Sequence, residues 1–592
     1  MDYTVPVQEQ LFVLETIADI GGLTGLQAFE HFHAGDVEAV LEEGAKIAER
    51  VLAPLNRKGD IEGARWSPEG VSLPDGFAQA YAAYREGGWG GLAVGTEHGG
   101  QGLPFALSVA LSEQVTAANM AFSLCMILTA GAIEAISAHG SETLRQSYLP
   151  QLVSGRWTGT MNLTEPQAGS DVGALRTMAT PASDGSWRIK GQKIFITWGD
   201  HDLAENIVHL VLARTPGSPS GTKGISLFVV PKYLPNDDGT LGAQNDLRCI
   251  SLERKLGIHA SPTCTMSFGD EGACVGFMVG DENSGMKAMF TMMNHARVSM
   301  GVQGIGIADR ARQAATRYAS ERIQSTPIGS TEPAAIINHM DVRRMLMTLR
   351  ATTEASRAIT YLNASAIDRA RGEEDAMARH RAKGLADLLT PITKAYATDI
   401  GVEMASLAIQ VFGGTGYIEE TGVAQLLRDI RIAPIYEGTN GIQALDLVGR
   451  KLRLDNGEPV SRLLDEMQSF LPLAQSRVET AALVAPLTEA IGRLRETTSA
   501  LQARDPAEAA AGATPYLRQF AVTLGGYLLL RQAVIAASRL TDGSDDPFLR
   551  AKIATARFFI EDVMAQEVSL SRIVLASGRD LLFALANEEL SA

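Results

Sequence analysis

GSWRIKGQKIFITWG, residues 185–199, carries two short runs of alternating character on either side of Lys-Gly-Gln, as two β-strands would. Two β-rich runs follow, NIVHLVLAR (206–214) and GISLFVVPK (224–232), with an exposed loop of Gly, Ser and Pro between them. CTMSFGD (264–270) adds another strand. These runs predict a small antiparallel, barrel-like β domain over residues 155–277.

Helical periodicity dominates on both sides of this domain. In DVEAVLEEGAKIAERVLAPL (36–55), apolar residues recur at spacings of three and four. We predict an N-terminal extension (1–35), an N-terminal helical domain (36–154), a C-terminal helical domain of the four-helix type (278–455) and an additional helical domain (456–592). The predicted fold class is therefore α+β, mostly α.

Composition narrows the classes of function. The 592 residues are 45% hydrophobic and carry a net charge of −16, with no block of five consecutive basic residues, which argues against nucleic acid or an anionic membrane as the main partner. The four cysteines form no CxxC pair, so we expect neither a disulfide framework nor a metal site. The longest apolar run, 120–133, is too short to span a bilayer, and no secretory signal is visible. We therefore expect a cytoplasmic protein without a membrane span, or an organelle-matrix protein if a targeting segment was removed.

Two stretches near the predicted strands could contact a ligand. In LTEPQAGSDVGALRT (163–177), Gly169 and Ser170 offer free N–H groups and a hydroxyl to a phosphate or a ring edge, although Ser and Asp are also routine helix caps. In KIFITWGD (193–200), Phe195 and Thr197 stand at i and i+2 and would face one flat heterocycle. The same alternation also fits an ordinary half-buried strand.

The helical part after the β domain holds the densest signal. MMNHARVSMGVQGIGIADRA (292–311) combines small residues, suited to close packing or close ligand approach, with Arg297, a position where a lone arginine is usually a surface charge. QVFGGTGYIEETGVAQLLRDIRIAPIYEGTNGIQ (410–443) contains a glycine loop and then Glu437 beside Gly438. Such an acid is most often solvated. With Thr439 and Asn440 nearby and an apolar segment before it, we expect a dry pocket that raises its pKa toward that of a general base.

Together, LTEPQAGSD (163–171), KIFIT (193–197), QVFGGTGY (410–417) and RDIRIAPIYEGTNGIQ (428–443) resemble the acyl-CoA dehydrogenase family of flavoproteins, over residues 36–452. The resemblance implies FAD as cofactor and conversion of an acyl-CoA to a trans-2-enoyl-CoA. Glu437 would remove the α-proton, and the β-hydrogen would leave as hydride to flavin N5. The backbone N–H of Glu437 would polarise the thioester carbonyl. Electron-transfer flavoprotein would be the electron acceptor.

The resemblance also assigns individual residues. Two departures stand out: Phe195 occupies a position where the family often has tryptophan, and no Phe-Gly follows Arg322. Some family members carry the base on the helix of Arg297, where this chain has Ala296, which cannot serve. Arg322 and the 410–414 loop match contacts that a second subunit makes in family dimers. The residues implied for FAD are Leu163, Thr164, Ser170, Phe195, Ile196, Thr197, Arg322, Gln410, Gly413, Gly414, Thr439 and Asn440, and those implied for the substrate are Ser170, Asn294, Arg297, Tyr436 and Gly438.

The chain runs about 35 residues before and about 140 residues beyond the typical family length. Both extensions, with HMDVRRMLM (339–347), resemble the bacterial branch that includes 3-(methylthio)propanoyl-CoA dehydrogenases of dimethylsulfoniopropionate breakdown. Medium- or long-chain acyl-CoA of fatty acid β-oxidation is the alternative substrate, and an acyl-CoA oxidase or a non-enzymatic helical scaffold is the alternative function. The extra helical domain favours a homodimer over a dimer of dimers.

Overall fold

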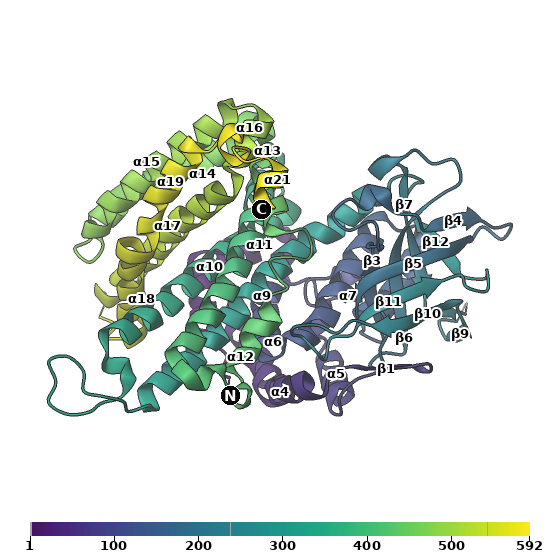
Figure 1. Cartoon of the computed structure of the whole chain (residues 1–592), viewed down its shortest axis with the longest axis horizontal. Coiled ribbons are helices and arrows are strands. Elements are labelled where there is room, and N and C mark those ends of the chain that lie inside the picture. Colours follow the sequence, from purple (N-terminus) through teal and green to yellow (C-terminus); the bar gives the residue numbers. More distant parts are fainter. Residues whose placement is uncertain (1–2, 237, 542, 592) are drawn as a thin grey trace. The chain divides into compact units, whose positions relative to one another are not determined.

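The structure, a computed structural model, describes residues 3–236, 238–541 and 543–591, without the side chains of 293–295. It contains two compact units (Figure 1). The helical unit comprises Met1–Glu42, Pro104–Glu113 and Met300–Ala592, and the mixed unit comprises Glu43–Leu103 and Gln114–Ser299. Three helices, α3 (Val37–Ile47), α6 (Phe105–Ala118) and α9 (Gly285–Glu321), contain residues of both. The order of helices, strands and helices confirms the predicted fold class. The four predicted domain boundaries stay predictions.

The mixed unit is built on one eight-stranded sheet in the order β10-β11-β5-β12-β7-β6-β3. β4 pairs with both β5 and β6, so the strands from β5 to β6 close into a ring, as predicted for a barrel-like domain. Pairing is antiparallel except where β3 and β4 lie parallel to β6. The strands are β3 (Trp157–Asn162), β4 (Met178–Pro181), β5 (Trp187–Thr197), β6 (Asn206–Arg214), β7 (Ile225–Pro231), β10 (Leu247–Leu252), β11 (Thr263–Phe268) and β12 (Val275–Val279), with two small hairpins, β1 (Arg65–Ser67) with β2 (Gly70–Ser72) and β8 (Tyr233–Pro235) with β9 (Leu241–Gln244).

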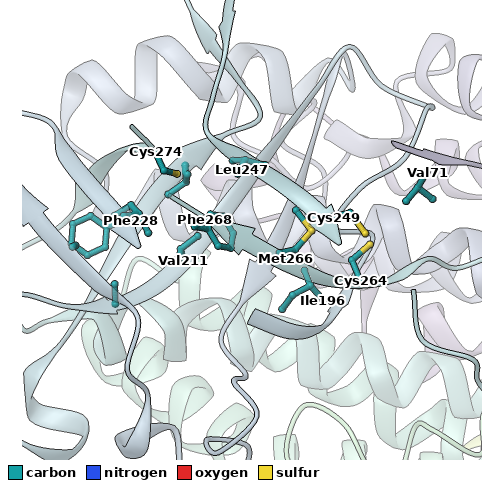
Figure 2. Packing of buried hydrophobic residues seen from close by; sticks show 14 residues of the cluster. Val71, Ile196, Val211, Phe228, Leu247, Cys249, Cys264, Met266, Phe268 and Cys274 are labelled. Atoms are coloured by element: carbon teal, nitrogen blue, oxygen red, sulfur yellow. The ribbon is translucent and has the colours of Figure 1, made fainter. Parts of the chain in front are cut away.

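Buried apolar side chains, most of them from strands of this sheet, form one cluster, and three of the four cysteines belong to it (Figure 2). All four cysteines are buried and free. Helix α7 (Met120–His139) packs on β3, where a Cβ at Gly159 would lie 2.4 Å from the Ala132 Cβ, so only glycine allows this approach. The other helices of this unit are α4 (Ala53–Glu62), α5 (Phe77–Glu86) and α8 (Glu142–Val153).

The helical unit is organised around α10 (Met340–Gly372) and α11 (Ala376–Phe412), which run side by side (Figure 1). α9 lies close against α11. A Cβ placed at Gly304 would fall 1.9 Å from the Ala397 carbonyl oxygen, so this approach requires glycine. The small residues of α9 thus serve helix packing at this point. The remaining elements are α1 (Val7–Thr16), α2 (Ile20–Thr24), α12 (Val423–Ile430), α13 (Asn440–Gly449), α14 (Glu458–Gln475), α15 (Ala481–Ala503), α16 (Pro506–Ala511), α17 (Ala513–Thr541), α18 (Pro547–Phe558), α19 (Glu567–Ala576), α20 (Arg579–Leu582) and α21 (Asn587–Leu590).

Within the described part of the chain, two helices, α7 and α17, are long and apolar enough to cross a membrane by length and composition alone. Of their most apolar windows, 78% and 89% respectively lie buried inside the structure. Such burial is what core helices of a folded domain show. The apolar run at 120–133, expected to be a buried helix, forms most of α7.

Buried ion pairs join distant segments of the helical unit. Arg357 on α10 lies 2.7 Å from a Glu113 carboxylate oxygen on α6 and 3.4 Å from Asp309 on α9. Lys552 on α18 contacts Glu9 on α1 at 2.8 Å and Glu354 on α10 at 2.6 Å. The N-terminal extension and α18 are therefore tied to α10 by charges that have little access to water.

Candidate active site

Glu437 lies on the short loop between α12 and α13, and its side chain is half-buried. Its φ is 56°, and that of Gly438 is 86°, so two consecutive residues adopt the left-handed conformation. For a residue with a side chain this conformation costs roughly 1–2 kcal/mol. Glycine at 438 avoids a second such penalty, which explains why a glycine follows the acid. Strain of this kind is concentrated at functional sites and is maintained by surrounding contacts.

The contacts that hold this loop come from α11 and α13. Lys394 Nζ lies 2.8 Å from the Gly438 carbonyl oxygen and 2.8 Å from Asn440 Oδ1. Asn440 Nδ2 donates to Asp399 Oδ1 at 2.7 Å. Gln443 Nε2 lies within 3.5 Å of the Glu437 carbonyl oxygen. Lys394, Asp399 and Gln443 are not among the predicted site residues: the first two lie about 40 positions before Glu437, and Gln443 is a buried residue at the end of its motif.

Thr439 and Asn440 were predicted to contact FAD. Within the helical unit, the Thr439 hydroxyl accepts a hydrogen bond from the Ile442 N–H at 3.3 Å and so caps α13. The Asn440 amide bridges Lys394 and Asp399. Burial raises the pKa of the Asp399 carboxyl, although the Asn440 hydrogen bond opposes this. Both side chains therefore shape the loop, and their contact with FAD stays a prediction.

Tyr436 precedes Glu437 and donates its hydroxyl to Gln303 Oε1 on α9. Burial raises the pKa of the Tyr436 phenol well above its usual range, so the hydroxyl keeps its proton and remains a donor. Gln303 Nε2 and Gln443 Oε1 are buried side-chain atoms that lack a hydrogen-bond partner among the described residues. The neighbourhood of Glu437 thus combines a fixed backbone with unused polar atoms, as a ligand-binding site does.

In the mixed unit, residues 163–165 lie against β5. The Ile194 N–H donates to the Thr164 carbonyl oxygen at 2.9 Å, and Lys193 Nζ donates to the Leu163 carbonyl oxygen at 3.0 Å. Lys193 Nζ also lies 2.8 Å from Glu165, and both side chains are almost fully buried. The structure thus brings together the two motifs, 163–171 and 193–197, that the family resemblance assigns to FAD.

The Glu165 carboxylate is the hub of this segment. Besides Lys193, it accepts hydrogen bonds from the Arg176 N–H, the Thr177 N–H and hydroxyl, and Gln167 Nε2, at 2.6–3.0 Å. Burial favours a higher pKa for the Glu165 carboxyl, but the Lys193 ammonium and these hydrogen bonds outweigh it and lower the pKa to about 2. Burial lowers the pKa of Lys193 to about 8. At neutral pH the two side chains form a buried ion pair.

Phe195 is exposed at 59% and has a φ of 59°. The pairing of β5 with β11 shifts here: Ile196 pairs with Cys264 and Lys193 with Met266, so two residues of β5 oppose one of β11. This is a β-bulge, which re-aims side chains. A regular strand does not continue through this point, and the shared face expected for Phe195 and Thr197 stays a prediction.

The remaining mixed-unit residues are placed as follows. Ile196 is buried, and Leu163, Thr164 and Thr197 are half-buried. Ser170 is exposed in an open loop, whereas Asp171 caps a short helical turn by accepting from the Gly173 N–H at 3.0 Å. The capping interpretation thus holds for the aspartate of this motif.

Arg297 is only 5% exposed, which corrects the expectation of a surface charge. Asn294 also lies in α9, but its side chain is outside the described residues. Arg322 is exposed just after α9, where its guanidinium donates to Gln324 Oε1 at 3.2 Å. One turn earlier, the Tyr318 ring stacks on Phe412 at 4.2 Å. This stacking brings the end of α9 beside three exposed residues, Gln410 in the last turn of α11 and Gly413 and Gly414 in the 3-10 helix that follows, where a loop was expected.

These observations fit FAD. An exposed aromatic ring suits a flat heterocycle, and the hydroxyls of Thr164 and Thr197 lie on segments whose backbones are fixed by hydrogen bonds. An open, exposed glycine loop, with nothing within 4 Å of a Cβ built at Gly169, leaves room for a phosphate. Among the described residues, no group of three or more His, Cys, Asp and Glu side chains could hold a metal ion.

Four family models match the chain: the acyl-CoA dehydrogenase N-terminal domain at 36–156, the middle domain at 160–270, the C-terminal domain at 283–452, and an acetyl-CoA dehydrogenase C-terminal-like domain at 463–585.

Relatives match over nearly the whole chain. A 3-methylmercaptopropionyl-CoA dehydrogenase of Ruegeria pomeroyi is 44% identical, over 99% of this chain and 100% of the relative. A butyryl-CoA dehydrogenase of Syntrophomonas wolfei is 36% identical over 95% of each. A broad-specificity linear acyl-CoA dehydrogenase of Mycobacterium tuberculosis is 31% identical over 98% of each.

Solved structures of acyl-CoA dehydrogenases share the fold of this chain. The acyl-CoA dehydrogenase of Bacillus anthracis complexed with FAD shares the fold, with a TM-score of 0.74 at 19% identity, over 96% of this chain and 94% of that chain. A chain solved with the electron transferring flavoprotein of Acidaminococcus fermentans is 26% identical with a TM-score of 0.59, over 71% of this chain and 98% of that chain. The chain therefore belongs to the acyl-CoA dehydrogenase family and is an oxidoreductase with FAD as its cofactor.

Proposed function

We propose that this acyl-CoA dehydrogenase oxidises 3-(methylthio)propanoyl-CoA to its trans-2-enoyl thioester, with Glu437 as the base. The observation that carries the reaction is the loop that presents Glu437, which is strained and held by buried contacts. The 44% identity to the Ruegeria pomeroyi enzyme over the full chain supports the substrate. In this substrate the thioether sulfur is bonded to the β-carbon, and its lone pair stabilises positive charge as hydride leaves.

The chain's residues have distinct tasks in this proposal. Glu437 removes the α-proton, and its backbone N–H donates to the thioester carbonyl oxygen, which stabilises the developing enolate charge. Tyr436, Gly438, Arg297, Asn294 and Ser170 contact the substrate. Bound FAD supplies the acceptor for the β-hydride. The residues proposed to hold it are Leu163, Thr164, Ser170, Phe195, Ile196, Thr197, Arg322, Gln410, Gly413, Gly414, Thr439 and Asn440.

The residue assignment is tested by the variant Glu437→Gln. It should retain FAD and bind acyl-CoA, but lose reduction of the flavin by substrate, because an amide cannot accept the proton. Glu374→Gln is a matched control, since Glu374 is an exposed residue between α10 and α11. Bleaching of the flavin absorbance, followed by stopped flow, is the measurement. Substantial bleaching by Glu437→Gln would place the base elsewhere.

A straight-chain acyl-CoA of fatty acid β-oxidation is the second candidate, favoured by the relatives from Syntrophomonas wolfei and Mycobacterium tuberculosis. One methylene in an apolar pocket discriminates by only about 1–3 kcal/mol, so a direct comparison is required. The panel is 3-(methylthio)propanoyl-, butanoyl-, octanoyl- and palmitoyl-CoA. A higher kcat/KM for any straight-chain substrate would overturn the thioether assignment.

We also propose that electron-transfer flavoprotein accepts the electrons, which the match to the Acidaminococcus fermentans chain supports. Release of peroxide in each turnover would instead indicate an oxidase.

The proposed assembly is a cytoplasmic homodimer. The four free, buried cysteines are consistent with a reducing compartment. Light scattering coupled to size exclusion measures the oligomeric state.

A further inference from the structure

Lys394 is a fully buried lysine on α11, with 0% of its surface exposed. An ammonium group is retained in such a place only when it is well paired and hydrogen-bonded. Two of its partners are oxygens of the loop that carries Glu437: the Gly438 carbonyl, at 2.8 Å, and Asn440 Oδ1, also at 2.8 Å. The ammonium therefore reaches the loop on both sides of residue 439.

The Gly438 carbonyl is one residue beyond Glu437. A hydrogen bond to it fixes the peptide that follows the two left-handed residues, at φ 56° and 86°. Because the conformation of Glu437 is unfavourable by itself, the loop would relax toward commoner conformations without an external contact. A relaxed loop would turn the carboxylate away from its present direction.

Asn440 makes this anchor rigid. Its Nδ2 donates to Asp399 Oδ1 at 2.7 Å and to the Ala395 carbonyl oxygen at 3.1 Å, while its Oδ1 accepts from Lys394. Lys394, Ala395 and Asp399 all belong to α11, so one face of a single long helix sets the position of the loop.

We propose that Lys394 is a positioning residue for proton abstraction, which acts by holding Glu437 in its strained conformation. This inference rests on the proposed role of Glu437 as the base. A misplacement of about 1 Å costs on the order of 10²-fold in rate, and that is the effect expected when the contact is removed.

The test measures the α-proton step alone. The FAD-loaded, full-length enzyme is incubated in D₂O with a 3-thia-acyl-CoA, in which sulfur replaces the β-carbon so that no hydride can leave. Deuterium entry at the α-carbon is followed by mass spectrometry. Lys394→Met should exchange on the order of 10²-fold more slowly, while FAD content and the Kd for the analogue stay unchanged. Lys383→Met is the control on the same helix, since the Lys383 side chain is 68% exposed, and it should exchange at the wild-type rate.

Combining variants separates the two proposals. If Lys394 acts through Glu437, Lys394→Met adds nothing to Glu437→Gln, and the double variant exchanges as slowly as Glu437→Gln alone. Wild-type exchange by Glu437→Gln would overturn the proposed base. Loss of exchange in Glu437→Gln together with wild-type exchange in Lys394→Met, or additive losses in the double variant, would overturn the positioning role.

A second variant covers the case in which Lys394→Met does not fold. Asn440→Ala removes one of the two loop oxygens that Lys394 contacts and leaves the lysine in place. Slower exchange with retained FAD supports the anchor, and exchange at the wild-type rate overturns it.

Discussion

Replacing Glu165 with glutamine should destabilise the mixed unit more than any surface change could. Glutamine has the shape of glutamate but carries no charge, and its amide nitrogen is a donor. At present the Glu165 carboxylate accepts from five donors, including the Arg176 N–H and Lys193 Nζ. Whichever way the amide is oriented, its nitrogen faces at least two of these donors, which then lose their acceptor.

The magnitude follows from Lys193. Its side chain is 0% exposed, and without Glu165 its ammonium would be a buried charge without a counter-charge. Breaking one partner of such a pair costs about 3–5 kcal/mol. Lys193 can limit the cost by releasing its proton, which for an ordinary lysine at pH 7 requires about 5 kcal/mol. We therefore expect a loss of about 3–5 kcal/mol in the free energy of unfolding.

Tryptophan fluorescence isolates this effect, because all five tryptophans (66, 89, 157, 187 and 198) belong to the mixed unit. Urea unfolding is measured at fixed excess FAD, since a ligand of the folded state adds its own stabilisation. The double variant Glu165→Gln/Lys193→Met is the matched control, and it should recover part of the loss because the unpaired charge is gone.

The way the stability of Glu165→Gln changes with pH is an independent test of the same reasoning. In the wild type, burial lowers the pKa of Lys193 to about 8, so at pH 7 and below the side chain is mostly protonated in both the folded and the unfolded chain. In Glu165→Gln the folded lysine is neutral while the unfolded one binds a proton. Stability of the variant should then rise by about 1.4 kcal/mol per pH unit near pH 7, where this group adds only a small slope in the wild type. A loss below about 1 kcal/mol without the extra slope would refute the reasoning.

Two further substitutions test other contacts. Phe195→Ala removes the exposed ring proposed to lie against the flavin, so the Kd for FAD should rise about 10–100-fold, equivalent to about 1.5–3 kcal/mol, whereas Phe195→Trp should bind FAD as the wild type does. Fluorescence titration of the apoprotein measures both Kd values, and an unchanged Kd in Phe195→Ala would contradict the proposed flavin site. Asp368 accepts from the Phe105 and Ala106 N–H groups at the start of α6, and burial raises its pKa to about 7. Since the folded state then binds a proton that the unfolded chain has released, stability should fall as pH rises from about 4 to 7, and Asp368→Asn should lack this slope in thermal unfolding followed by circular dichroism.

Periodicity was enough to predict the alternation of helices and strands, because it reflects which faces are buried. It was not enough at Phe195. There the direction of the side chain depends on a bulge against β11, which is set by pairing with residues about 70 positions away. Arg297 shows a similar limit: its burial is decided by what packs on α9, not by its neighbours in sequence. For Gly304 the sequence allowed two interpretations, and the approach of Ala397 selects helix packing.

The two lysines that anchor the candidate site show why its supporting residues escape sequence analysis. Lysine is almost never fully buried unless it is paired, so Lys193 and Lys394 read as surface residues. Each also donates to a backbone carbonyl oxygen, of Leu163 and of Gly438 respectively, and a carbonyl leaves no mark in a sequence. Each ammonium reaches two oxygens on separate groups, one on the backbone and one on a side chain. A compact charge with three rotatable donors can satisfy such a pair, whereas the planar fork of arginine matches two oxygens of one carboxylate. Charge alone therefore does not explain why lysine occupies these two positions. The three donors of each ammonium can point at two separate oxygens at once. Lys193 thereby fixes the segment that begins at Leu163, beside the proposed flavin, and Lys394 fixes the loop that carries the proposed base.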